Sequence, residues 1–209
     1  MNIGLKRTSN SIIKQKKVYV FLISLITIAL VSGIFFWFML SNDDKILITS
    51  ELTNFFNCIK KGTSINYWGS LLNSIITNLL YIILIWLLGI SIIGLPIILI
   101  MIAIKSFIIG FSISSIIAVY GFKGILGSIV YIFPHQIGFL LLLLLLGFYS
   151  ISFCIKLFKY LFLKQIINFK VVMRRYLKIL ILSVLIAVML SLFETLISTY
   201  LIKLFTTII

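Results

Sequence analysis

The sequence predicts an all-α polytopic membrane protein, in which about five transmembrane helices form a single bundle. Of its 209 residues, 62% are hydrophobic and only 11% are charged, and the mean hydropathy is +1.28. A soluble domain of this size needs far more polar surface. The apolar runs are long enough to cross a bilayer. They are also continuous rather than alternating with polar residues, which favours helices over membrane strands.

The chain starts with a basic cytoplasmic tail, residues 1–17, which holds five Lys and Arg residues and no acid. The first expected span, residues 18–40, is too long for the apolar part of a secretory signal, and no small-residue cleavage site follows it. We therefore expect a retained signal-anchor. The length of the chain predicts one integral-membrane bundle over residues 18–209 and no separate soluble domain.

Residues 41–69 form the longest polar connection, which we expect to be an outer loop. Within it, large apolar residues recur at helical spacing with acidic and amide residues between them, which predicts an amphipathic helix. The apolar positions are Ile48, Leu52, Phe55, Phe56 and Ile59. Two interpretations stay open: the helix lies on the membrane surface, or its apolar face docks a partner outside the membrane.

Four further spans are expected along the rest of the chain. They cover residues 70–89, 96–120, 136–155 and 179–205. Residues 121–135 are rich in glycine and mildly apolar, so we expect a re-entrant or interfacial segment before the fourth span. Residues 156–178, which precede the fifth span, hold seven basic residues and no acid.

The distribution of basic residues predicts the orientation, because cytoplasmic connections of membrane proteins are enriched in Lys and Arg. With a cytoplasmic N-terminus, residues 1–17 and 156–178 both lie on the cytoplasmic side. A sixth span over residues 121–135 would put these two basic segments on opposite sides, so the rule favours five spans. The net charge of +14 is then a consequence of topology, and we do not expect nucleic-acid binding.

The side chains that usually carry chemistry are scarce. The chain has one histidine, two cysteines without CxxC spacing, and no P-loop. A catalytic triad or a metal site needs more converging His, Cys, Asp or Glu residues than this. We therefore expect no catalytic residues, no metal and no cofactor, and we do not expect an enzyme.

Three ionisable residues fall within or beside the expected spans: Lys105, His135 and Glu194. At 1.5 Å per residue, Lys105 lies roughly 13 Å along the third span and Glu194 roughly 22 Å along the fifth. Three interpretations stay open: a buried Lys105–Glu194 pair, separate partners such as lipid, or a transport or proton pathway. His135 follows Pro134, and we expect its ring to serve the loose backbone groups where the fourth span begins.

An ordered set of short motifs resembles the stage II sporulation protein M family over nearly the whole chain. The motifs are LLGISIIGLPIIL, KSFIIGF, GFKGIL and IFPHQI, with Gly89, Gly94, Pro96, Gly110, Phe111, Gly121, Gly124 and Pro134 at the family's positions. Glu194 stands where that family carries an acid in its last span. The chain departs from the family pattern at Ser106, which is usually glycine, and broader relatives carry a glutamate where this chain has Phe139.

The resemblance implies a membrane scaffold on the mother-cell side of the sporulation septum. It would anchor two peptidoglycan hydrolases, stage II sporulation proteins D and P, during engulfment of the forespore. The apolar positions of the outer loop would contact these partners, and partner transmembrane segments would pack on small-residue faces such as Gly110–Ser114. The alternative is a permease-like transport subunit, as one chain or a homodimer, with Lys105, His135 and Glu194 along its pathway.

Overall fold

The fold is helical throughout the part of the chain that the computed structural model describes, residues 2–60, 67–131, 133–162 and 168–195. These residues form six helices: α1 (Asn2–Met39), α2 (Asn42–Lys60), α3 (Tyr67–Ile90), α4 (Gly94–Tyr131), α5 (Phe133–Phe162) and α6 (Phe169–Phe193). All except α2 are long and apolar enough to cross a membrane. The prediction of a helical membrane bundle with five spans is therefore confirmed.

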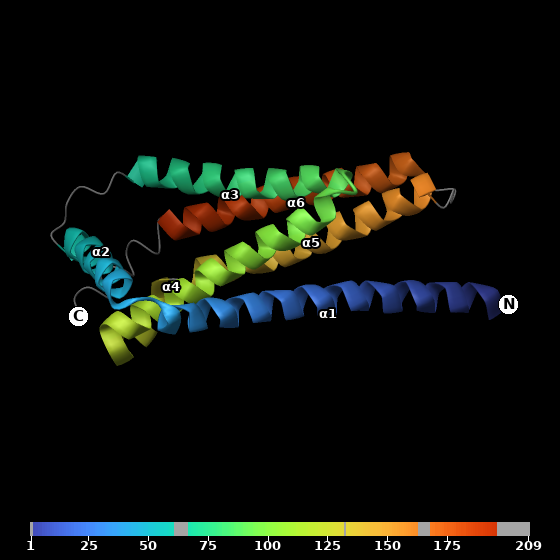
Figure 1. The fold of residues 1–209 in the computed structure, drawn as a ribbon. Helices are drawn as coiled ribbons and strands as arrows, with labels where there is room; N and C mark the ends of the chain where they lie inside the picture. The colour runs from blue at the N-terminus through green and yellow to red at the C-terminus, as the bar shows by residue number, and fades with distance from the viewer. Residues whose placement is uncertain (1, 61–66, 132, 163–167, 196–209) are drawn as a thin grey trace.

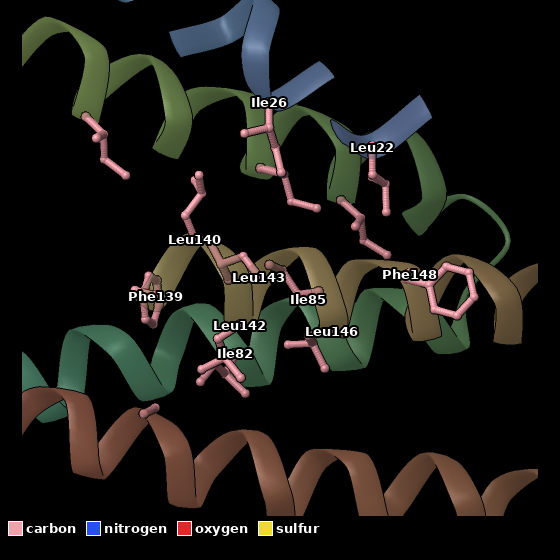
Figure 2. Close-up of a cluster of buried hydrophobic side chains, with 14 of the residues drawn as sticks. Leu22, Ile26, Ile82, Ile85, Phe139, Leu140, Leu142, Leu143, Leu146 and Phe148 are labelled. Atoms are coloured by element: carbon pink, nitrogen blue, oxygen red, sulfur yellow. The ribbon is translucent and has the colours of Figure 1, made fainter. Parts of the chain in front are cut away.

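The fourth span is the centre of the bundle. In α5, 56% of the most apolar segment is buried, a larger share than in any of the other four spans. Figure 2 shows why: Leu140 and Leu143 of α5 point toward Ile26 of α1, while other leucines of the same run face Ile82 and Ile85 of α3. A helix that is apolar on all sides is stable where neighbours surround it, and the leucine run of α5 is such a helix.

The two ends of the bundle differ in charge. In Figure 1 the start of α1, the end of α5 and the start of α6 lie toward one end, whereas α2 and the start of α3 lie toward the other. The first end carries both basic segments, and the second carries the three acids of the expected outer loop. This arrangement is the one that the basic residues predict for five spans.

The helices extend beyond the expected spans at the basic end. The structure has α5 continuing to Phe162 and α6 beginning at Phe169, so most of the basic segment 156–178 is helix rather than loop. The basic tail is also helical, because α1 begins at Asn2. Residues 196–205 of the expected fifth span lie outside the described residues.

The closest helix crossing joins α1 to α4. A Cβ atom added at Gly110 would lie 2.1 Å from the carbonyl oxygen of Leu30, and one added at Gly33 would lie 2.2 Å from that of Phe107. The absence of side chains lets the two backbones touch, as small residues do in membrane helix pairs. The expected docking face Gly110–Ser114 is therefore wrong at Gly110, which α1 of the same chain already covers.

The α3–α4 link shows what the motif LLGISIIGLP does. A Cβ atom on Gly94 would lie 1.9 Å from the carbonyl oxygen of Leu88, so the tight turn excludes a side chain there. Pro96 follows in the first turn of α4, where its missing N–H has no helical partner to lose. Gly89 leaves room for the Tyr176 hydroxyl, which donates a hydrogen bond to the carbonyl of Trp86 at 2.8 Å.

Gly121 interrupts α4. Its backbone has φ 58° and ψ −134°, a conformation that side chains make costly. The chain then folds back against the preceding part of α4. The close approach is shown at Gly124, where an added Cβ atom would lie 2.4 Å from the carbonyl oxygen of Ile116. The segment after Gly121 is helical to Tyr131, and its re-entrant or interfacial placement stays a prediction.

The amphipathic helix expected within residues 41–69 is α2. Its start is capped by Ser41, whose hydroxyl oxygen accepts the N–H of Asp44 at 3.2 Å and donates to the Asp44 carboxylate at 2.7 Å. This reciprocal pair satisfies a backbone donor that the first helical turn leaves without a partner. The helix therefore begins where the polar connection begins, directly after the first span.

The orientation can be tested with the two cysteines. Cys58 is exposed on α2 and Cys154 is buried in α5. We expect a membrane-impermeant thiol reagent, added to intact cells, to label Cys58 in a Cys154→Ser background. A cysteine placed at exposed Arg174, in a chain without the other two, should react only after lysis. Labelling of both positions from the same side of the membrane would contradict the five-span topology.

Candidate functional site: a polar cluster and a cavity beside α2

Polar side chains from three helices meet at the α2 end of the bundle. His135, in the first turn of α5, places Nε2 3.1 Å from Oε2 of Glu194, the residue after α6. The hydroxyl of Ser74 on α3 donates a short hydrogen bond to the same carboxylate oxygen. These contacts tie the ends of α5 and α6 to α3.

A second layer supports the first. The side-chain amide of Asn78 donates to the Ser191 hydroxyl at 3.0 Å and makes a longer contact, 3.4 Å, with the Ser74 hydroxyl. We call Ser74, Asn78, His135, Ser191 and Glu194 the polar cluster. It forms a chain of donors that starts at Asn78 and ends on the Glu194 carboxylate.

The burial of the cluster explains its composition. The side chain of His135 is 4% exposed and that of Glu194 is 31% exposed. A charged group inside a membrane bundle is costly unless it is paired, so the Glu194 carboxylate needs partners even though it lies toward one end of the bundle. His135 Nε2 has no aligned hydrogen bond, and its contact with Glu194 is therefore an ion pair by distance.

The sequence prediction missed Ser74 and Asn78. Both lie on α3, four residues apart and therefore on one face, in a first half of the helix that also holds Ser70, Asn73 and Thr77. Asn78 is 5% exposed. An amide at this depth in an apolar span was the available signal, since a polar group in lipid needs a partner on another helix.

Lys105 and Glu194 do not form the pair that the sequence left open. Among the residues that the structure describes, the ion pair of Glu194 is with His135, and the Lys105 ammonium lies over the Phe139 ring, 5.3 Å from its centre. The expectation that His135 serves loose backbone groups is wrong for Nε2, which faces the carboxylate.

A cavity of about 310 Å³ opens beside α2, and we call it the α2 cavity. Its walls are Leu52, Phe55, Phe56, Lys105, Ile108, Ile109, Ser112, Ser115, Ile116 and Gln136. These residues come from α2, α4 and the first turns of α5. Lys105 is the one charged residue of this wall, and neither His135 nor Glu194 belongs to it.

A comparison with known families decides the classification. The family model for stage II sporulation protein M matches residues 21–199. The chain belongs to the stage II sporulation protein M family. No curated protein and no solved structure matches it. Family membership and the five apolar helices together make this chain a sporulation-related, multi-pass membrane protein.

In this family member, the apolar face of α2 is divided between the bundle and the outside. Phe56 is 5% exposed and packs edge-on against Tyr120 of α4, with ring centres 5.3 Å apart. Leu52 also packs against the core, and Ile48 is half-buried. Phe55 is 44% exposed. Of the expected contact residues with described side chains, Phe55 is thus the most exposed, while the side chain of Ile59 lies outside the described residues.

The remaining family motif residues that the structure describes make packing or hydrogen-bond contacts within the bundle. Phe111 of α4 lies against two aromatic rings of α1, with its ring centre 5.8 Å from that of Phe36 and 6.3 Å from that of Trp37. Ser106, the departure from the family's glycine, is fully buried and donates to the carbonyl of Ile102 at 2.8 Å. Pro134 is the second residue of α5, and its side chain lies outside the described residues.

Proposed function

We propose that this chain is a membrane scaffold that catalyses no reaction itself. It would anchor stage II sporulation proteins D and P at the septum, on the mother-cell side, during engulfment. The observation that supports this most is α2, which packs against α4 through Phe56 and has three large apolar side chains that are at least 44% exposed. Ile46, Leu47 and Phe55 of α2 are 67%, 63% and 44% exposed.

The uncovered side of α2 has the composition of a docking surface. A shallow depression there is lined by Leu47, Ile48, Glu51, Leu52 and Phe55. Four of its five lining residues are apolar and the fifth is Glu51, and protein interfaces likewise combine an apolar centre with polar residues at the rim. A bundle that fixes this surface at one membrane face would hold its partners in two dimensions, which raises their effective concentration without a chemical step.

The test is co-purification of the two hydrolases from sporulating cells. We expect the triple change Ile46→Ser, Leu47→Ser and Phe55→Ser to reduce their recovery by about tenfold or more, since a few buried apolar side chains carry most of the affinity of an interface. The matched control replaces exposed polar residues of the same helix, Ser50, Asn54 and Asn57, by alanine. The proposal fails if the triple-serine chain inserts normally and retains both hydrolases.

The permease-like alternative needs a path that joins Lys105, His135 and Glu194. The α2 cavity reaches Lys105 but has neither of the other two residues in its wall. His135 Nε2 instead lies 3.1 Å from the Glu194 carboxylate, away from the cavity wall. These contacts favour a structural role for the polar cluster over a transport pathway.

A further inference from the structure

One face of α4, in which Lys105, Ser112 and Ser115 alternate with isoleucines, forms a stripe along the α2 cavity. The wall residues of α4 are Lys105, Ile108, Ile109, Ser112, Ser115 and Ile116, which follow helical spacing. From Lys105 to Ile116 the stripe extends roughly 16 Å at 1.5 Å per residue. The cavity therefore runs along the helix, with a cation at one end and the aromatic residues of α2 beside the other.

The cation in this wall has no carboxylate partner. Within the described part of the chain, no carboxylate lies within ion-pair distance of Lys105, and its ammonium contacts the π face of Phe139. A cation–π contact contributes about 0.5–2 kcal/mol. It leaves the three N–H donors of the ammonium free to bind an anion.

The neutral polar groups of the wall offer oxygen atoms that can still accept hydrogen bonds from a ligand. The hydroxyls of Ser112 and Ser115 donate to their own helix, to the carbonyls of Ile108 and Ser112, so their oxygens remain acceptors. Oε1 of Gln136 is buried and has no hydrogen-bond partner. Such an oxygen costs free energy unless a ligand or water donates to it.

We propose that the α2 cavity binds the headgroup of an anionic phospholipid that carries hydroxyl donors, such as phosphatidylglycerol. The phosphodiester meets the Lys105 ammonium, and the glycerol hydroxyls donate to Gln136 Oε1 and the serine oxygens. Six of the ten wall residues are apolar, which suits the acyl portion of a lipid rather than a free anion. A volume of about 310 Å³ lies at the lower end of the range for small-molecule sites.

The α2 cavity and the proposed docking surface share Leu52 and Phe55, whereas Leu47 lines the docking depression alone. Phe55 and Phe56 line the cavity from α2, so a bound lipid would fill space under the helix that carries the exposed surface. The scaffold proposal rests mainly on Ile46 and Leu47, which do not line the cavity, and the variants that test lipid binding all lie on α4. Loss of lipid binding and loss of the hydrolases are therefore separate results, measured by separate experiments.

The experiment is native mass spectrometry of the intact chain in detergent with equal amounts of dioleoyl-phosphatidylglycerol and dioleoyl-phosphatidylcholine. We expect one phosphatidylglycerol to be retained in preference to phosphatidylcholine. Lys105→Met should reduce that retention by about tenfold, as expected for one lost charge-assisted hydrogen bond. Lys178→Met, which removes an exposed cation outside the cavity, should retain it. Excess glycerol phosphate should not displace the lipid.

A second variant separates lipid binding from folding. Ser112→Phe fills the cavity while leaving Lys105 in place, and it should also reduce retention of phosphatidylglycerol. Lys105→Arg should restore part of the binding that Lys105→Met removes. Equal retention of both lipids, unchanged retention in Lys105→Met, or displacement by glycerol phosphate would each overturn the proposal.

Discussion

Replacing Gly110 by alanine should separate α1 from α4 and destabilise the bundle by about 3 kcal/mol or more. The added Cβ atom itself would lie 2.1 Å from the carbonyl oxygen of Leu30, and a backbone atom cannot move aside as a flexible side chain can. Overpacking in well-packed cores costs about 1–3 kcal/mol and occasionally more. Gly110→Leu should be more severe, because several further atoms would need space at the same crossing.

The effect can be measured by unfolding the purified chain from mild detergent into SDS. The matched control is Ala118→Leu, which adds a large side chain at an exposed position of the same helix. In a lipid-facing position leucine is favourable, so the control should unfold like the parent chain. Equal stability of Gly110→Ala and the parent chain would show that the crossing is looser than the structure has it.

Gly33→Ala tests the same crossing from α1. Its Cβ atom would lie 2.2 Å from the Phe107 carbonyl oxygen, so we expect a loss of similar size. Because both changes separate the same pair of backbones, the double variant should lose less than the sum of the two single losses. Additive losses would mean that the two glycines stabilise unrelated contacts.

The spans were predictable because their cause is local. A bilayer requires runs of apolar residues of a set length, and each run can be read from the chain without knowledge of its neighbours. The amphipathic helix α2 was predictable for a similar reason, since its apolar residues recur at helical spacing. The helix ends were harder to predict. The helices α5 and α6 continue through basic residues beyond the apolar region, and hydropathy identifies only the apolar part of a helix.

Which side chain pairs with Glu194 could not be predicted from the depth of each residue along its expected span. The fifth span was expected to begin near Ile179, whereas α6 begins at Phe169. Depths counted along separate spans also say nothing of which helices face each other, and that is what brings Glu194 to His135 instead of Lys105. In the same way, the sequence shows that Gly110 is small but not that α1 is the helix that covers it.

Replacing His135 by leucine should destabilise the bundle by about 2–3 kcal/mol. The change leaves the Glu194 carboxylate with Ser74 alone in an apolar setting, and breaking a buried ion pair from one side costs about 3–5 kcal/mol. We place the value below that range because the Glu194 side chain is 31% exposed. Glu194→Leu should cost less, because an imidazole can be buried as a neutral group.

The double variant His135→Leu, Glu194→Leu should recover most of the loss. Apolar replacement of a complete buried pair is often neutral, because the cost of removing two charges from water disappears with the charges. The Ser74 hydroxyl can then donate to a carbonyl of its own helix. Unfolding in SDS measures the four members of this double-mutant cycle, with Glu51→Leu on exposed α2 as the control for loss of a carboxylate. If the single losses simply add in the double variant, His135 and Glu194 are not coupled, and the polar cluster does not join α5 to α6.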